Sequence, residues 1–195
     1  ATLDEARGLG RLVEDLRTLS LAEAGQLPMT WEPVDVAELL ADVGVSFGGL
    51  AEAAGLTLTV TSAPGLTLTG DAGRLDQVLG NLVANALRHT PRGGAITLRA
   101  EPFSLADGRR AVRIIVSDTG EGIAAADLPY IFDRFWRGDR ARTRADGAGS
   151  GLGLAIARQL VLAHAGSITA ESTAGRGTVF TLDLPLDPTP RPDRA

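Results

Sequence analysis

The sequence predicts an α+β domain: a two-layer sandwich in which helices cover one face of a mixed, largely antiparallel sheet. Segments of helical and of strand periodicity follow one another as helix, strands, helix, hairpin, loop, helix and hairpin. This order lacks the repeated strand–helix–strand crossovers that would indicate a parallel sheet. Apolar residues make up 44% of the 195 residues and charged residues 22%, which is a globular rather than a disordered composition.

The first element is an amphipathic helix from about residue 3 to 24, whose apolar stripe contains Leu9, Leu12, Leu16 and Leu19. Gly25 is placed to end it, and Pro28 follows. We therefore divide the chain into this helix (1–25), a linker (26–34), one principal domain (35–186) and a disordered tail (187–195).

The first half of the principal domain contains two capped helices. Asp35 can cap a helix that runs to about residue 54, and Asp71 a second one that stops near residue 91. Between them, two alternating segments at 56–60 and 66–69 predict short strands.

The second half is built from two hairpins around a helix. Residues 95–103 and 109–118 predict a long hairpin, and residues 138–150 a loop with little periodicity. A third helix at about 151–165 and a closing hairpin at 167–172 and 177–186 complete the sheet.

Charge and composition exclude several kinds of site. The net charge of −5 provides no basic surface for nucleic acid, so we expect no nucleic-acid partner. The absence of cysteine excludes disulfides and thiolate sites. No apolar run approaches the ~20 residues of a membrane helix.

Three segments carry residues that could bind a ligand, and each also has a simpler explanation. Asn81 and Asn85 share a helix face that could present amide oxygens to a cation, or be merely solvated. Asp118, at a strand end before "TGEGI", could accept a hydrogen bond from a base amine, or form an Asx turn. The alternate glycines of "GAGSGLG" (147–153) could direct backbone N–H groups at an anion, or form a flexible connection.

Taken together and in order, these segments resemble the catalytic, ATP-binding domain of sensor histidine kinases. "QVLGNLVANALRHT" is similar to that family's N-box, "DTGEGI" to its first glycine box and "YIFDRFWR" to its F-box. "GSGLGLAI" and "GRGT" resemble the later glycine boxes, and "LVEDLRTLSLAEAGQL" the second helix of the dimerisation and phosphotransfer hairpin. The resemblance implies a Bergerat-type ATP-binding fold over about residues 35 to 185.

The resemblance also implies roles for individual residues, with ATP and Mg²⁺ as the ligands. Asn85 would coordinate Mg²⁺, Asn81 would support it or the phosphates, and Arg88 would contact phosphate. Arg137 would reach the γ-phosphate, and these four form the expected catalytic set. Asp118 would bind the adenine amine and Thr178 would help through water, while His89 would line the pocket. The remaining expected nucleotide-binding residues are Gly120, Gly122, Ile123, Gly149, Ser150, Gly151, Leu152, Gly153 and Leu154.

Position 81 separates two activities within this superfamily. The superfamily that the chain resembles also includes gyrase-like ATP hydrolases, which typically carry a glutamate at the position of residue 81 as the general base. Asn81 cannot accept a proton at neutral pH, whereas a histidine acceptor already has a lone pair. The sequence therefore favours phosphoryl transfer to histidine over the two alternatives, an ATP hydrolase and a non-catalytic nucleotide-binding module.

The phosphoacceptor box of the family is missing, because the two histidines, His89 and His164, lack its context. We expect a fragment that acts on the histidine hairpin of its parent kinase, which would form a homodimer and pass the phosphoryl group to a response regulator. We expect the fragment to be a cytoplasmic part of a membrane-anchored parent. Without the first hairpin helix, the leucine stripe of residues 9–19 is expected to lack its partner and to fray or self-associate.

Three aromatic side chains are expected to be structural. Phe132 and Phe135, three residues apart, and Trp136 are expected to pack the base of the loop onto the domain. His164 is expected to be a structural or surface histidine.

Overall fold

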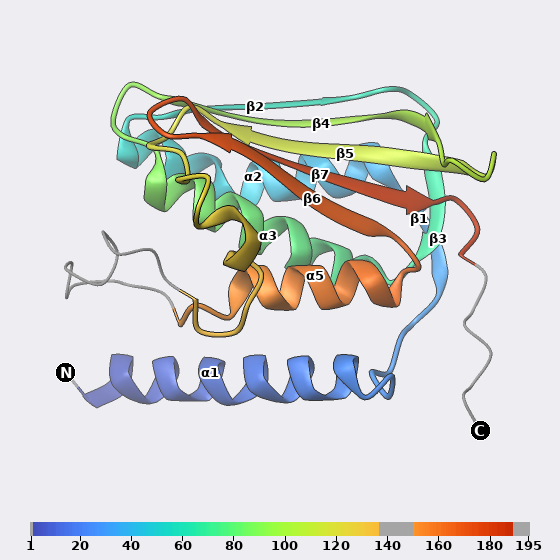
Figure 1. Ribbon diagram of the computed structural model, residues 1–195, viewed down its shortest axis with the longest axis horizontal. Coiled ribbons are helices and arrows are strands. Elements are labelled where there is room, and N and C mark those ends of the chain that lie inside the picture. Colours follow the sequence, from blue (N-terminus) through green and yellow to red (C-terminus); the bar gives the residue numbers. More distant parts are fainter. Residues whose placement is uncertain (1, 137–149, 189–195) are drawn as a thin grey trace.

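The computed structural model describes residues 2–136 and 150–188, except for the side chains of residues 2–8 and 11. Figure 1 shows a sheet covered on one face by helices, with the N-terminal helix beneath them. The elements in chain order are α1 (Thr2–Glu23), β1 (Glu32–Asp35), α2 (Val36–Ala54), β2 (Thr57–Ser62), β3 (Thr67–Gly70), α3 (Ala72–His89), β4 (Ala95–Ser104), β5 (Arg110–Asp118), the 3₁₀ helix η1 (Leu128–Tyr130), α5 (Gly153–Ala163), β6 (Ser167–Thr173) and β7 (Gly177–Pro185).

The sheet confirms the predicted fold class. Five strands pair in the order β2-β4-β5-β7-β6, and only the β2–β4 pair among them is parallel. The connection between these two strands runs through β3 and α3, so a single crossover brings α3 under the sheet. The two hairpins, β4–β5 and β6–β7, form as predicted.

One strand was not predicted. β1 lies at the end of the predicted linker and pairs antiparallel with β3 in a separate two-stranded ribbon. The two strands predicted at 56–60 and 66–69 therefore join different sheets. A four-residue strand has little periodicity of its own, and its partner β3 is supplied from more than thirty residues away.

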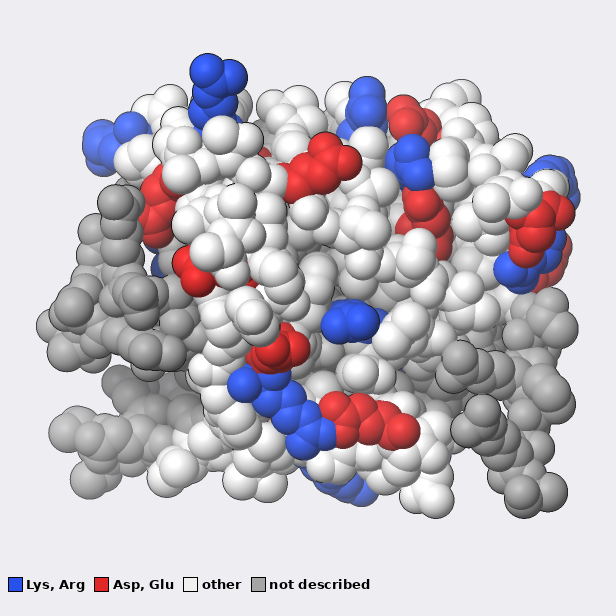
Figure 2. Space-filling view, in the orientation of Figure 1, with Lys and Arg blue, Asp and Glu red and all other residues white. Residues whose placement is uncertain are grey.

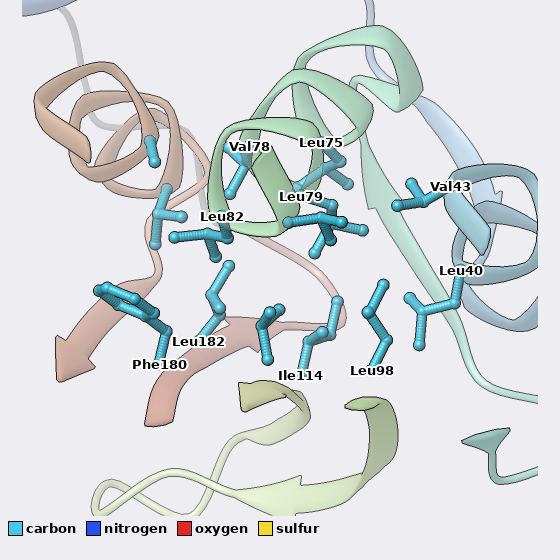
Figure 3. Packing of buried hydrophobic residues seen from close by; sticks show 14 of the residues in the cluster. Leu40, Val43, Leu75, Val78, Leu79, Leu82, Leu98, Ile114, Phe180 and Leu182 are labelled. Atoms are coloured by element: carbon cyan, nitrogen blue, oxygen red, sulfur yellow. The ribbon is translucent and has the colours of Figure 1, made fainter. Parts of the chain in front are cut away.

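The core lies between the sheet and the helices α2, α3 and α5. α3 is central: its apolar side chains Val78, Leu79 and Leu82 are all 1% exposed or less. Figure 3 shows them above Leu98 and Ile114 of the sheet, with side chains of α2 on one side. Because the apolar stripe of α3 is buried in this core, the polar stripe of the same helix faces away from the core.

Both predicted helix caps are present. Asp35 accepts hydrogen bonds from the backbone of Ala37 at 2.8 Å and Glu38 at 3.1 Å. Asp71 accepts one from the backbone of Arg74 at 3.0 Å. Each carboxylate satisfies N–H groups that have no partner within the first turn of its helix.

α1 is partnered over its C-terminal half, where the sequence predicted an unpartnered stripe. Leu19 is 1% exposed and Leu16 packs against the core, whereas Leu9 and Val13 are 64% exposed. The partner is α5, along which α1 runs in Figure 1. The expectation was therefore wrong for this half of the helix, because a stripe that has lost one partner can bury itself against another apolar surface.

An ion pair adds to this contact. Arg134 donates from Nε to Glu23 Oε1 at 3.0 Å, and its Nη2 meets the other carboxylate oxygen. Figure 2 shows basic and acidic side chains interspersed across the visible face. The last turn of α1 is thereby joined to the segment after η1.

Candidate functional site

Four of the predicted site residues lie on one face of α3. Asn81, Asn85, Arg88 and His89 follow one another at helical spacing, opposite the stripe that α3 buries in the core. The two asparagines and the histidine are half-buried, while Arg88 is exposed. Neighbouring segments therefore cover this face in part at Asn81, Asn85 and His89, and it is open to solvent at Arg88.

The two asparagines differ in what they contact. Asn81 Nδ2 donates to the carbonyl oxygen of Gly153 at 3.1 Å, which links α3 to the start of α5. The Asn85 amide makes no hydrogen bond to another described residue. Of the pair, Asn85 therefore has its side-chain oxygen available for a ligand.

Asp118 lies at the end of β5 and is 8% exposed. Its Oδ1 accepts hydrogen bonds from the backbone of Gly120 at 2.8 Å and of Thr178 at 3.3 Å. Burial raises the pKa of this carboxyl, and the two backbone donors oppose that rise. Since Oδ1 alone makes the Asx-type turn, Oδ2 can still accept from a ligand, so the two interpretations of Asp118 are compatible.

Thr178, at the start of β7, is buried beside Asp118 and contacts a residue that was not predicted from the sequence. Its Oγ1 lies 3.0 Å from the Oγ of Ser172, on β6. Ser172 also accepts from the backbone of Ile123 at 2.8 Å and donates to the carbonyl of Gly177 at 2.7 Å. A usable signal existed: alternation along β6 places Ser172 on the same half-buried face as Ile168, where a polar residue needs partners.

The glycines of the turn after β5 are explained by close approach of the chain to itself. A Cβ on Gly120 would lie 2.5 Å from the carbonyl oxygen of His89, and one on Gly122 would overlap the carbonyl oxygen of Thr173. Gly122 also has φ +66°, which favours glycine. Approach of a ligand to these two glycines stays a prediction.

His89 joins the end of α3 to this turn. Its Nδ1 lies 2.8 Å from Glu121 Oε1, and its carbonyl oxygen accepts from the backbone of Glu121 at 3.1 Å. Glu121 was not predicted as a site residue, because nothing in the sequence indicates that it meets a histidine 32 residues earlier. The side-chain contact thus adds to the backbone bond between the end of α3 and the turn after β5.

These residues bring an amide face, a buried carboxylate and a glycine turn together at one end of the sheet. The family model described as "Histidine kinase-, DNA gyrase B-, and HSP90-like ATPase" matches residues 70–188, which contain all of them. The chain belongs to this ATPase family.

Individual relatives are histidine kinases. The chain is 37% identical over 185 residues to the signal transduction histidine-protein kinase BaeS of Escherichia coli, covering 94% of this chain and 38% of BaeS. Histidine kinase AdeS of Acinetobacter baumannii superposes with a TM-score of 0.75 at 27% identity, over 94% of this chain and 81% of that one. Full-length ShkA, solved in complex with AMPPNP, superposes with a TM-score of 0.78 at 31% identity. The match covers 96% of this chain and 38% of ShkA. The chain thus spans well under half of BaeS.

The second glycine segment of this ATPase-family domain is fixed by packing at its described end. Gly151 has φ +72°, and its carbonyl accepts from the backbone of Phe135 at 3.0 Å. Leu152 is fully buried, and Leu154 packs against the core. Ser150 Oγ accepts from the backbone of Leu152 at 3.3 Å. Binding of nucleotide by these residues stays a prediction.

Two predicted site residues, Arg137 and Gly149, lie outside the described residues, as does most of the predicted loop at 138–150. Within the described part of the chain, no three His, Cys, Asp or Glu side chains cluster as a metal site.

The aromatic residues before this loop behave differently from one another. Phe132 meets Phe180 edge to face, with ring centroids 6.3 Å apart, and Trp136 packs against the core. Phe135 is 55% exposed, so its predicted role as a core anchor was wrong. The segment turns at Phe135 with φ +60° instead of continuing as a helix, and this points the side chain outward.

His164 is structural, as predicted, and buried rather than on the surface. Its Nε2 accepts from the backbone of Asp71 at 3.0 Å, and its Nδ1 lies 2.7 Å from the carbonyl oxygen of Leu160. Burial lowers its pKa. Since a carbonyl only accepts and an N–H only donates, these partners fix the neutral ring with its hydrogen on Nδ1.

Proposed function

We propose that this chain binds Mg-ATP between α3, the end of β5 and the start of α5, and transfers the γ-phosphoryl group to a histidine outside these 195 residues. The observation that carries the proposal is the buried Asp118, whose Oδ2 can still accept while Oδ1 holds the turn, next to the amide face of α3. The AMPPNP complex of ShkA supports a nucleotide as the ligand.

The adenine end of the nucleotide is assigned to Asp118 and Thr178. An exocyclic amine donates hydrogen bonds, and a carboxylate only accepts them. The carboxylate of Asp118 therefore favours a donor on the ligand over an acceptor. Because Asp118 is only 8% exposed, little water competes with the ligand, and this strengthens the preference.

The phosphate end is assigned to the polar face of α3. Asn85 is the proposed Mg²⁺ ligand, since its amide has no other described partner and Mg²⁺ takes only one or two protein oxygens beside a phosphate ligand. When bound, the ion neutralises charge on the transferred phosphoryl group. Arg88, which is exposed, and Arg137 are the proposed phosphate contacts.

Transfer to histidine fits this site better than hydrolysis. In the transfer, a bond forms between an imidazole nitrogen and the γ-phosphorus, the bond to the bridging oxygen breaks, and ADP leaves. A neutral imidazole needs no general base, whereas water does. Asn81 cannot act as one, and its amide is already hydrogen-bonded to Gly153.

The acceptor is proposed to be on a hairpin of the parent kinase. His164 is 1% exposed, so its imidazole is inaccessible, and the half-buried His89 has its Nδ1 engaged by Glu121. Homodimerisation through that hairpin, a response regulator as the next acceptor and a cytoplasmic location with any membrane anchor elsewhere in the parent complete the proposal. None of the described helices is long and apolar enough to cross a membrane.

The test is a transfer assay with the chain, radiolabelled ATP, Mg²⁺ and the parent's histidine-bearing hairpin. We expect label on the hairpin, and loss of label with Asn85→Ala. Release of phosphate without the hairpin would support the hydrolase instead. Nucleotide binding without transfer or hydrolysis would support the non-catalytic module.

A second measurement isolates the role of Asn85. Calorimetry of ATP binding with and without Mg²⁺ is expected to show that Asn85→Ala abolishes the Mg²⁺-dependent part of the affinity. Gln77→Ala, one turn before Asn81 on the same helix, is the matched control and should leave that part unchanged. Unchanged Mg-ATP affinity in Asn85→Ala would remove Asn85 from the site.

A further inference from the structure

Ser172 occupies a junction between three segments of the site. Its hydroxyl accepts from the backbone of Ile123 at 2.8 Å, donates to the carbonyl of Gly177 at 2.7 Å and lies 3.0 Å from the hydroxyl of Thr178. Through these bonds β6 contacts both the turn after β5 and the first residues of β7.

The partners of Ser172 decide which hydroxyl donates to the other. A serine hydroxyl has one hydrogen and two lone pairs. The hydrogen goes to Gly177, because a carbonyl can only accept, and the N–H of Ile123 occupies one lone pair, because it can only donate. The second lone pair is all that remains for Thr178, so the threonine donates its only hydroxyl hydrogen to Ser172.

Thr178 therefore meets a ligand as an acceptor only. Its backbone N–H is also engaged, donating to Asp118 Oδ1 at 3.3 Å. Asp118 accepts as well, so the neighbouring side-chain groups of both residues offer lone pairs to a ligand or to a water between ligand and protein. A purine with an amino group at C6 supplies hydrogens to such a pair, whereas one with a carbonyl at C6 directs lone pairs at it.

We propose that Ser172 is a positioning residue for nucleotide specificity: it holds the Thr178 hydroxyl as an acceptor and so favours 6-amino over 6-oxo purines. This inference rests on the proposed nucleotide function. Ser172 acts through Thr178 and needs no contact with the ligand itself.

The first test is calorimetry of the whole chain with ATP and with inosine triphosphate, which carries a carbonyl at C6. Ser172→Ala lets the Thr178 hydroxyl rotate and donate, so the ratio of ATP to inosine triphosphate affinity should fall about tenfold, the size of one neutral hydrogen bond. Ser172→Thr keeps the hydroxyl and should show the same ratio as the unmodified chain. Thr169→Ala, an exposed hydroxyl on the same strand, is the matched control and should leave the ratio unchanged.

The second test asks whether Ser172 acts through Thr178. Thr178→Val removes the hydroxyl at nearly constant shape, and adding Ser172→Ala to it should not lower the ratio further. Additive losses in the double variant would overturn the proposal. So would an equal loss of affinity for both nucleotides in Ser172→Ala, because a merely structural role affects both alike.

Two controls keep the outcome interpretable. If Ser172→Ala does not fold by circular dichroism, Ser172→Cys replaces it; the thiol is a weak donor and acceptor, and an unchanged ratio overturns the proposal. If the unmodified chain binds neither nucleotide, the proposed function fails and this inference fails with it. If it binds ATP and Ser172→Ala keeps the full preference, only the role of Ser172 is overturned.

Discussion

The side-chain amide of Asn81 donates to the carbonyl oxygen of Gly153 at 3.1 Å and so joins the middle of α3 to the first residue of α5. Asn81→Asp keeps the shape and replaces the donor with a carboxylate that faces a carbonyl. We expect the free energy of unfolding in urea to fall by about 1 to 2 kcal/mol.

The control for this change is Gln159→Glu, which adds the same charge to α5 at a residue with no hydrogen bond to another described side chain. Its free energy of unfolding should stay within about 0.5 kcal/mol of the unmodified chain. Equal stability of the Asn81→Asp variant and this control would show that the Asn81–Gly153 bond contributes nothing in solution.

Asp118→Asn is expected to alter nucleotide choice while preserving the turn. An asparagine oxygen can still accept from the backbone of Gly120 and Thr178, but an amide donor replaces the second oxygen. Calorimetry should show the preference for ATP over GTP collapsing by about tenfold or more. Retention of the preference in both Asp118→Asn and Asp118→Ala would contradict the assignment.

The raised pKa of Asp118 gives this site a pH dependence. As the pH falls, the buried carboxyl takes up its proton at a higher pH than an ordinary aspartate, whose pKa is 3.8. The protonated group presents a donor, so ATP affinity should decline on acidification in the unmodified chain. The Asp118-dependent part of this decline should be missing in Asp118→Asn, and calorimetry at several pH values compares the two.

How far the sequence predicts this molecule depends on the range of the interactions involved. Asp35 and Asp71 were predicted as caps because a cap and its partners lie within three residues of each other. Asp118 was placed correctly for a similar reason, since a strand end followed by glycine is a local pattern. Ser172 was missed because its partner Ile123 is 49 residues away, and Phe135 was misjudged because its positive φ arises from tertiary packing against Gly151.

Gly177→Ala should strongly destabilise the domain. Gly177 has φ +94°, and a Cβ there would overlap the carbonyl oxygen of Asp118. Both strain and overlap must be relieved by moving β7 at the site, so we expect thermal unfolding at a markedly lower temperature, equivalent to about 3 kcal/mol or more.

Gly175→Ala is the matched control, because Gly175 has a similar φ of +78° but no atom within 4 Å of the added Cβ. It carries the backbone strain alone and should cost only about 1 kcal/mol. Equal losses in the two variants would show that close approach to Asp118 contributes nothing.

Glu23→Ala should loosen α1 with little effect on global stability. The Glu23–Arg134 pair is partly exposed, and such pairs contribute about 0 to 1 kcal/mol. Hydrogen exchange measured by mass spectrometry should nevertheless become several-fold faster over the last turns of α1, because local opening no longer has to break the pair. Glu14→Ala, which removes only an exposed contact to Arg17 within α1, is the control.

His164 should make the stability of the domain depend on pH. Burial lowers its pKa in the folded state, while in the unfolded chain the value is close to the ordinary 6.5. Below that pH the unfolded chain binds a proton that the folded chain resists, so acidification favours unfolding. The stability from this residue is present above about pH 6.5 and is lost as the pH falls toward the folded-state pKa.

His164→Gln tests this directly, because the glutamine side chain can accept from the Asp71 backbone but does not titrate. Urea unfolding at pH 7.5 and pH 5.5 should show a larger loss of stability on acidification in the unmodified chain than in the variant. His89→Gln, which removes the other histidine, should retain the part of the loss that comes from His164. If His164→Gln loses as much stability on acidification as the unmodified chain, proton uptake by His164 does not limit the folded state.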